Sequence, residues 1–195
     1  MQYCLPSHRG RVVAFEQKWS SCQLCPLQEN RSKVVLWRGY LPCDILIVGE
    51  APGSFEDAEG LPFIGPSGLL INDLCGDSET EYERLCLRNP RVKWCFTNVV
   101  CCLPPKVQGN LREPSSEEIA ACKPRLAEFI RLAEPRVIVA AGKVAAAHVE
   151  HQETVMHPSS LLQAGKHLIG GVYVKQIHRL VSAIEKVGNY ERQSS

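Results

Sequence analysis

Four short runs of apolar residues, many of them β-branched, predict strands in the chain. They are Asp44–Gly49, Val92–Val100, Arg136–Ala140 and the less apolar Glu153–Met156. Runs that are apolar at consecutive positions are typical of strands covered on both faces. We therefore expect these strands to form the interior of a mostly parallel sheet.

Segments with helical character lie between and after these runs. The clearest begins at Ser115 or Ser116, either of which can cap its first turn, and ends before Pro135. Other helices are expected at Gly68–Cys75, Thr80–Leu87, Gly142–Val149 and Lys175–Lys186. The alternation of strands and helices predicts an α/β fold, in which ligands bind at the carboxyl ends of the strands.

Loops rich in glycine, proline and polar residues follow three of the predicted strands. The longest runs from Val48 to Gly68, although an ordinary connection needs only a few residues. A long ordered loop of this kind is more often built around a ligand. The side chains expected to meet in a common pocket are Glu50, Phe63, Asn98 and His157.

Composition indicates one globular domain over residues 1–195, with 45% hydrophobic and 22% charged residues. No apolar run reaches the ~18 residues of a membrane helix, and the first residues lack the apolar segment of a secretory signal. We expect a cytoplasmic protein without a membrane partner. Because the formal net charge is only +1, DNA would be contacted by a local set such as Arg112, Lys143, Lys166 and His167.

Four of the ten cysteines are candidate metal ligands. Cys22 and Cys25 have the C-x2-C spacing that lets two thiolates meet one metal centre, and Cys102 and Cys122 can complete the set. Zinc and an iron-sulfur cluster both accept four cysteines, and the C-x2-C pair can also occur by chance. The cysteines expected only to fill the core are Cys43, Cys75, Cys86, Cys95 and Cys101.

Six motifs, in order from Cys22 to about Leu162, resemble those of the family 4 uracil-DNA glycosylases, the iron-sulfur-containing branch of their superfamily. The motifs are CQLCPL, VGEAPGSFEDAEGLPFIGPSGLL, TNVVCCLPP, GNLREPSSEEIAAC, EPRVIVAAGKVAA and HPSSLL. The resemblance implies a three-layer sandwich with a central four-stranded parallel sheet flanked by helices. It also implies a structural 4Fe-4S cluster on Cys22, Cys25, Cys102 and Cys122, and a monomer that acts on uracil in single- or double-stranded DNA.

The chain departs from the usual family pattern in several places. The segment between Cys102 and Cys122 is longer than the common form, with KVQ and Leu111 inserted. Cys101 and Leu103 stand where basic residues are common, and Gln163 stands where arginine is common. Which of Cys101 and Cys102 binds the cluster is therefore open, and we favour Cys102.

The resemblance also assigns roles in the pocket. Phe63 matches the phenylalanine that stacks on uracil, and Asn98 matches the amide that reads its N3 and C4 edge. His157 matches the histidine that donates to O2 as negative charge develops on the leaving base. Backbone N–H groups of the first loop, at Gly49 and Ala51, can add further donors.

A carboxylate could stabilise positive charge on the sugar or orient water. The candidates, in order of preference, are Glu50, Glu56 and Asp57, and for Asp57 a role in capping the turn is an equal alternative. No one of these acids is an obvious general base.

Three alternatives compete with an active uracil glycosylase of DNA base excision repair. A related branch binds uracil DNA covalently through a histidine between the third and fourth cysteines, but that segment here contains no histidine. A catalytically inactive module that binds DNA or a replication protein would keep the fold and the cluster. An enzyme for another deaminated base would differ only in its pocket width.

Overall fold

A computed structural model describes residues 2–66, 68, 92–157, 179, 182, 183 and 185–187 of the chain. The expected helices at 68–75 and 80–87 lie almost entirely outside these residues. Of the expected helix at 175–186, the described residues are helical. Among the described residues, no helix has the length and apolar character needed to cross a membrane.

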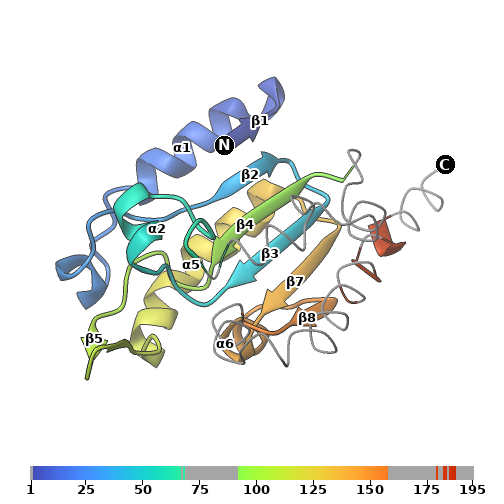
Figure 1. Ribbon diagram of the computed structural model, residues 1–195. Coiled ribbons are helices and arrows are strands. Elements are labelled where there is room, and N and C mark those ends of the chain that lie inside the picture. Colours follow the sequence, from blue (N-terminus) through green and yellow to red (C-terminus); the bar gives the residue numbers. More distant parts are fainter. Residues whose placement is uncertain are drawn as a thin grey trace.

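The four predicted strands form a continuous parallel sheet, as expected. They are β4 (Trp94–Asn98), β3 (Ile45–Gly49), β7 (Val137–Ala141) and β8 (Glu153–Val155), which are neighbours in that order (Figure 1). All five residues of β3 and of β4 are buried. Apolar runs of this kind therefore mark the covered centre of the sheet.

The sheet is wider than predicted, because two further strands extend it to six. β2 (Arg38–Leu41) pairs antiparallel with β4, and β1 (Gln2–Cys4) pairs parallel with β2. Both are short strands with several exposed or half-buried residues, and β1 lies at the edge of the sheet. Their sequences carry no apolar run, so the pattern that found the central strands could not find them.

Helices and apolar side chains cover both faces of the sheet. Leu46 and Val48 of β3 pack with α1 (Arg9–Trp19) and α5 (Ser116–Ala133) in one core. Ile45 and Ile47 point to the other face, where a second core includes Ala183 and Val187 of the C-terminal helical segment. This alternation gives the three layers that were expected.

The best-predicted helix is α5, and its capping explains why. Ser115 is the N-cap, and its hydroxyl accepts from the backbone N–H of Glu118 at 3.2 Å. The Glu118 carboxylate accepts in return from the N–H of Ser115 at 2.7 Å. These reciprocal bonds satisfy two backbone donors that a helix start leaves open.

Two shorter helices frame the carboxyl edge of the sheet. α6 (Lys143–His148) follows β7, as expected for the segment 142–149, whereas α2 (Ser54–Glu59) lies inside the long loop after β3 and was not predicted. α1 was missed as well, although its buried residues Val12, Phe15 and Trp19 keep a helical spacing.

Candidate active site and cysteine pocket

One open pocket of about 700 Å³ lies at the carboxyl edge of the sheet. Its lining includes residues from three loops that are far apart in the sequence. Among them are Glu50, Ala51, Glu56, Phe63, Asn98 and His157. The structure therefore brings the predicted side chains together, as expected from the convergence of parallel strand ends.

Gly49 makes the closest approach in this pocket possible. It pairs with Asn98 at the ends of β3 and β4. A Cβ on Gly49 would lie 2.4 Å from the Asn98 Oδ1 atom and 2.6 Å from the Phe63 Cζ atom. Any side chain at this position would therefore displace the amide, the ring or both.

Phe63 is held in an unusual backbone conformation. Its φ is 59°, in the left-handed region, and its side chain is only 7% exposed. Arg38 fixes the turn, because its Nε donates to the Pro62 carbonyl at 2.9 Å and its Nη2 to the Phe63 carbonyl at 3.3 Å. The ring packs against Phe96 with a centroid distance of 5.4 Å. A non-glycine residue kept in this region indicates that the surrounding contacts fix the ring in place.

Two acids of the long loop are bound to backbone groups. Glu56 Oε2 accepts from the N–H of Gly53 at 3.1 Å, and Oε1 accepts from the N–H of Gly65 at 2.9 Å. Asp57 accepts from the N–H of Ser32 at 3.0 Å and 2.9 Å. Both carboxylates therefore stabilise the folded loop, and a part for Glu56 in catalysis stays a prediction.

Glu50 and His157 lie in the same pocket with shifted pKa values. Burial, and then the nearby charge of Glu113, raise the pKa of the Glu50 carboxyl above its ordinary value. Burial lowers the pKa of His157. A Cβ on Gly142, whose φ is +93°, would lie 2.9 Å from the His157 Cβ. The glycine at the start of α6 thus lets the histidine lie against the backbone.

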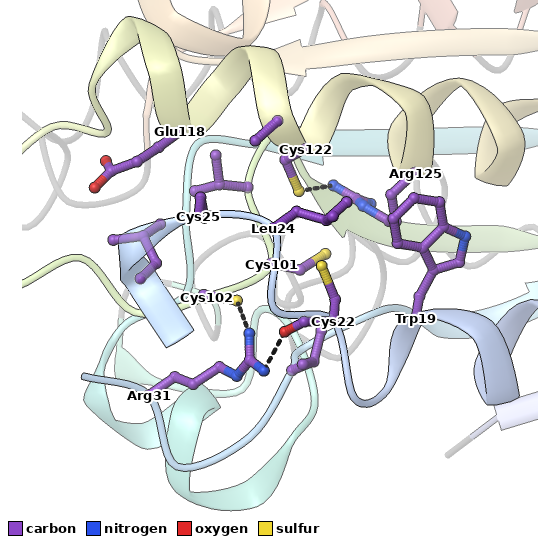
Figure 2. Close-up of a pocket in the computed structure, with 14 residues that line it drawn as sticks. Trp19, Cys22, Leu24, Cys25, Arg31, Cys101, Cys102, Glu118, Cys122 and Arg125 are labelled. Carbon is purple, nitrogen blue, oxygen red and sulfur yellow. Dashed lines mark hydrogen bonds between the residues drawn. The ribbon is translucent and has the colours of Figure 1, made fainter. Parts of the chain in front are cut away.

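A second pocket collects cysteines from three segments of the chain. Cys22 and Cys25 come from the loop after α1, Cys102 from the segment after β4 and Cys122 from α5. All four line this pocket, and so does Cys101 (Figure 2). Among the described residues, no three Cys, His, Asp or Glu side chains are arranged so that they could bind a single metal ion. The choice between Cys101 and Cys102 stays a prediction.

Two arginines lie against these sulfur atoms, and neither was predicted. Arg31 Nη1 donates to the Cys102 Sγ at 3.1 Å, and its Nη2 donates to the carbonyl of Cys22. Arg125 Nη2 lies 3.6 Å from the Cys122 Sγ (Figure 2). The sequence signal was weak, because Arg125 is one charged residue three positions after a cysteine in a helix with many other charges.

Arg125 is almost completely buried, with 1% exposure. Its guanidinium donates to Thr97 Oγ1 at 3.0 Å and to the carbonyls of Asn98 and Val99 at 2.6 Å and 2.9 Å. No carboxylate is among its hydrogen-bond partners in the described part of the chain. A buried cation needs a compensating anion. Among the described residues that line the cysteine pocket, Glu118 is already paired with Arg112, which leaves the cysteine sulfur atoms to supply one. The cysteines and the two arginines beside them therefore fit a negatively charged metal centre bound by thiolates.

Of the four basic residues expected to contact DNA, Arg112 is already paired with a carboxylate. Arg112 pairs with Glu118, at 2.8 Å to Oε2 and 2.5 Å to Oε1. Lys143 lines the pocket as a candidate phosphate ligand. Lys166 and His167 lie outside the described residues.

The sequence model of the uracil DNA glycosylase superfamily matches residues 39–180, which include β3, β4, β7, β8 and the pocket between their ends. The chain belongs to this superfamily. The match to type 4 members expected from the motifs is confirmed by three curated relatives, each named type-4 uracil-DNA glycosylase.

The Thermotoga maritima relative is 33% identical over 193 residues, which cover 88% of this chain and 94% of that protein. The Pyrobaculum aerophilum relative is 39% identical over 126 residues, covering 65% of this chain and 58% of the relative. The Sulfurisphaera tokodaii relative is 40% identical over 123 residues, covering 63% and 50%. The match thus spans only about half the length of the last two proteins.

Replacing Glu56 with glutamine tests the loop-stabilising role of this carboxylate. A glutamine amide would place an N–H₂ group against one of the two backbone donors, so we expect a loss of about 1–3 kcal/mol in the free energy of unfolding. The measurement is urea denaturation of the purified protein. Glu59→Gln is the matched control, because Glu59 is exposed on the same helix, and equal midpoints for both variants would contradict the role.

Proposed function

We propose that the protein is a uracil-DNA glycosylase that flips uracil out of DNA and hydrolyses its N-glycosidic bond, leaving an abasic site. The observation that carries the proposal is the single pocket in which Asn98, Phe63, Glu50 and His157 meet. Family membership and the names of the relatives support it. The substrate would be uracil in single- or double-stranded DNA, bound by a cytoplasmic monomer.

Base recognition rests on Asn98 and Phe63. Asn98 is 3% exposed and lines the pocket, so its amide would face a base bound there. Uracil offers an N3 donor beside an O4 acceptor, and one amide group can bind both atoms. Cytosine has the opposite pattern at C4, so binding it would leave buried polar groups unpaired, at about 1–3 kcal/mol each. The Phe63 ring would stack on the flipped base.

Departure of the base rests on His157. Cleavage places negative charge on uracil, chiefly at O2, and a donor aimed at that charge stabilises the transition state more than the ground state. The lowered pKa of His157 favours a neutral imidazole at neutral pH. Its N–H group would then donate a hydrogen bond to O2. Backbone N–H groups at Gly49 and Ala51 are further donors.

We assign stabilisation of the positive charge that develops on the sugar to Glu50. The carboxylate lines the pocket, and within the described residues it has no backbone hydrogen bonds like those that bind both oxygens of Glu56. We therefore keep Glu50 first among the acids, ahead of Glu56. Its ionised form would stabilise the oxocarbenium-like sugar and orient water.

The cofactor would be a 4Fe-4S cluster bound by Cys22, Cys25, Cys102 and Cys122. When bound, the cluster supplies a covalent link between three chain segments rather than a redox step. The positive charges of Arg31 and Arg125 would offset its negative charge. An inactive module that binds DNA or a replication protein is disfavoured, because every residue proposed for binding and cleavage is retained.

The cluster predicts about four iron atoms per chain and a brown protein with broad visible absorbance. Replacing Cys22, Cys25, Cys102 or Cys122 with alanine should lower both iron content and absorbance, whereas Cys101→Ala should change them little. Metal analysis and visible spectra of the purified variants measure this. A colourless protein with one zinc ion would contradict the cluster, and iron loss in Cys101→Ala but not in Cys102→Ala would reverse the ligand choice.

Substitutions of His157, Asn98 and Phe63 should reduce DNA binding and uracil excision to different extents. His157→Ala should lower single-turnover excision roughly 100-fold while leaving binding of uracil DNA nearly unchanged, because its donation is strongest in the transition state. Asn98→Asp should weaken both binding and excision. Phe63→Ala should lose stacking energy of about 1–3 kcal/mol.

Single-turnover rates and binding constants on one uracil-containing oligonucleotide separate these outcomes. His151→Ala is a matched control, because His151 does not line the pocket and lies in the loop before β8. A His157→Ala variant that excises uracil as fast as the wild type would remove His157 from the mechanism.

The raised pKa of Glu50 predicts the acid limb of the pH profile. Because the ionised form is required, excision should fall as the pH drops through this pKa, at a higher pH than for an ordinary glutamate. In Glu50→Gln the rate should be lower and this limb should be absent. The measurement is kcat/KM against pH, and an unchanged acid limb in the variant would assign it to another group.

A further inference from the structure

Arg38 reaches the active-site loop from a strand that lies more than twenty positions earlier in the sequence. It is the first residue of β2 and pairs directly with Phe96 of β4, the neighbouring strand (Figure 1). Gly39 makes this pairing possible, because its φ is +113° and a Cβ there would lie 2.3 Å from the Trp94 carbonyl oxygen. A side chain at position 39 would push β2 away from β4, and Arg38 with it.

The Arg38 guanidinium makes two kinds of contact beside the pocket. It donates to the carbonyls of Pro62 and Phe63, which fixes the backbone on both sides of the Phe63 nitrogen. Its Cζ atom also lies 4.3 Å from the centroid of the Phe96 ring, a distance at which a cation is attracted to an aromatic face. Phe96 is the ring against which Phe63 packs. One cation therefore holds both the Phe63 backbone and the ring that supports it.

Phe63 depends on such contacts because its backbone is strained. A φ of 59° is unfavourable for a bulky side chain, so a loop without these contacts would relax toward a negative φ. Since φ sets the direction of the Cα–Cβ bond, relaxation would turn the ring away from Gly49, where a Cβ would lie only 2.6 Å from the Phe63 Cζ atom. The orientation of the stacking ring is thus coupled to the two hydrogen bonds from Arg38.

Arg38 can influence a bound base only through Phe63. Among the described residues that line the pocket are Phe63 and Asn98, but not Arg38. A ring that is already oriented in the free protein loses less conformational entropy when a base stacks on it, and so binds the base more tightly. Loss of Arg38 should therefore weaken binding of the base and leave contacts with the DNA backbone unchanged.

We propose that Arg38 is the positioning residue for base stacking, which holds Phe63 in its left-handed conformation and the Phe96 ring behind it. The strand β2 thereby becomes a part of the base-binding site, although its side chains are separated from the pocket by Phe63. The proposal rests on the proposed function of the same pocket. It assigns the affinity for the flipped base in part to a residue that touches neither the base nor the sugar.

The test compares the binding of two single-stranded oligonucleotides by the iron-loaded protein. One carries a single 2′-fluoro-2′-deoxyuridine, whose glycosidic bond resists cleavage, and the other has cytosine at that position. We expect Arg38→Met to weaken binding of the uracil oligonucleotide about tenfold and to change binding of the cytosine oligonucleotide less than about twofold. When Phe63 is already alanine, adding Arg38→Met should change uracil binding less than about twofold, because the two residues act as one unit.

Arg136→Met is the matched control, because Arg136 lies at the start of β7 and pairs with Asp44 at 3.5 Å. It should bind both oligonucleotides as the wild type does. Arg38→Lys keeps a cation and one donor group, and it is measured in the same way so that the test stands if Arg38→Met does not fold. We expect it to weaken uracil binding about threefold, again only when Phe63 is present.

Two results would overturn the positioning role of Arg38 alone. One is unchanged uracil binding in both Arg38 variants, and the other is a loss that is equal on the two oligonucleotides or persists without Phe63. A wild-type protein that releases no uracil from DNA would instead overturn the proposed function, and the role of Arg38 with it.

Discussion

The buried guanidinium of Arg125 connects the active-site pocket with the cysteine pocket. It donates to the carbonyls of Asn98 and Val99 at the end of β4, and it lies against the Cys122 sulfur on its other side. A cation with 1% exposure is strongly unfavourable without a partner of opposite charge. Thiolates of the proposed cysteine centre would supply that partner, and the position of the Asn98 backbone would then depend on the charge of the cysteine pocket.

Through the contacts of Arg125, the proposed cluster would help to fix the position of Asn98, which we propose recognises the base. The four candidate ligands come from the loop after α1, the segment after β4 and the helix α5, and no disulfide joins these segments in the described chain. Asn98 is the last residue of β4 and pairs with Gly49 of β3. A metal centre that holds these segments would therefore also hold the amide that we propose reads the base, without taking part in bond cleavage.

Much of this arrangement could be predicted from the sequence, because it follows from patterns that are local. The four predicted strands are apolar runs, and α5 has a complete capping box. Glu50 directly follows β3, Asn98 ends β4, and His157 lies two residues after β8. The two strands that were missed, β1 and β2, have no such pattern. The helix α2 was hidden in a loop of glycine, proline and acid, and its capping residue Glu56 was interpreted only as a candidate catalyst. The role of Arg125 depends on hydrogen bonds to residues 26 to 28 positions away in the sequence, which no local pattern records.

The most direct test of this coupling compares Arg125→Met with Arg131→Met, a matched control on the exposed side of the same helix. Iron content and the affinity for uracil-containing DNA are measured on the same preparation of each variant. The coupling predicts that Arg125→Met loses both iron and affinity, because the thiolates lose their cation and Asn98 loses its anchor, while Arg131→Met keeps both. An Arg125→Met protein with full iron and wild-type affinity for uracil DNA would contradict it.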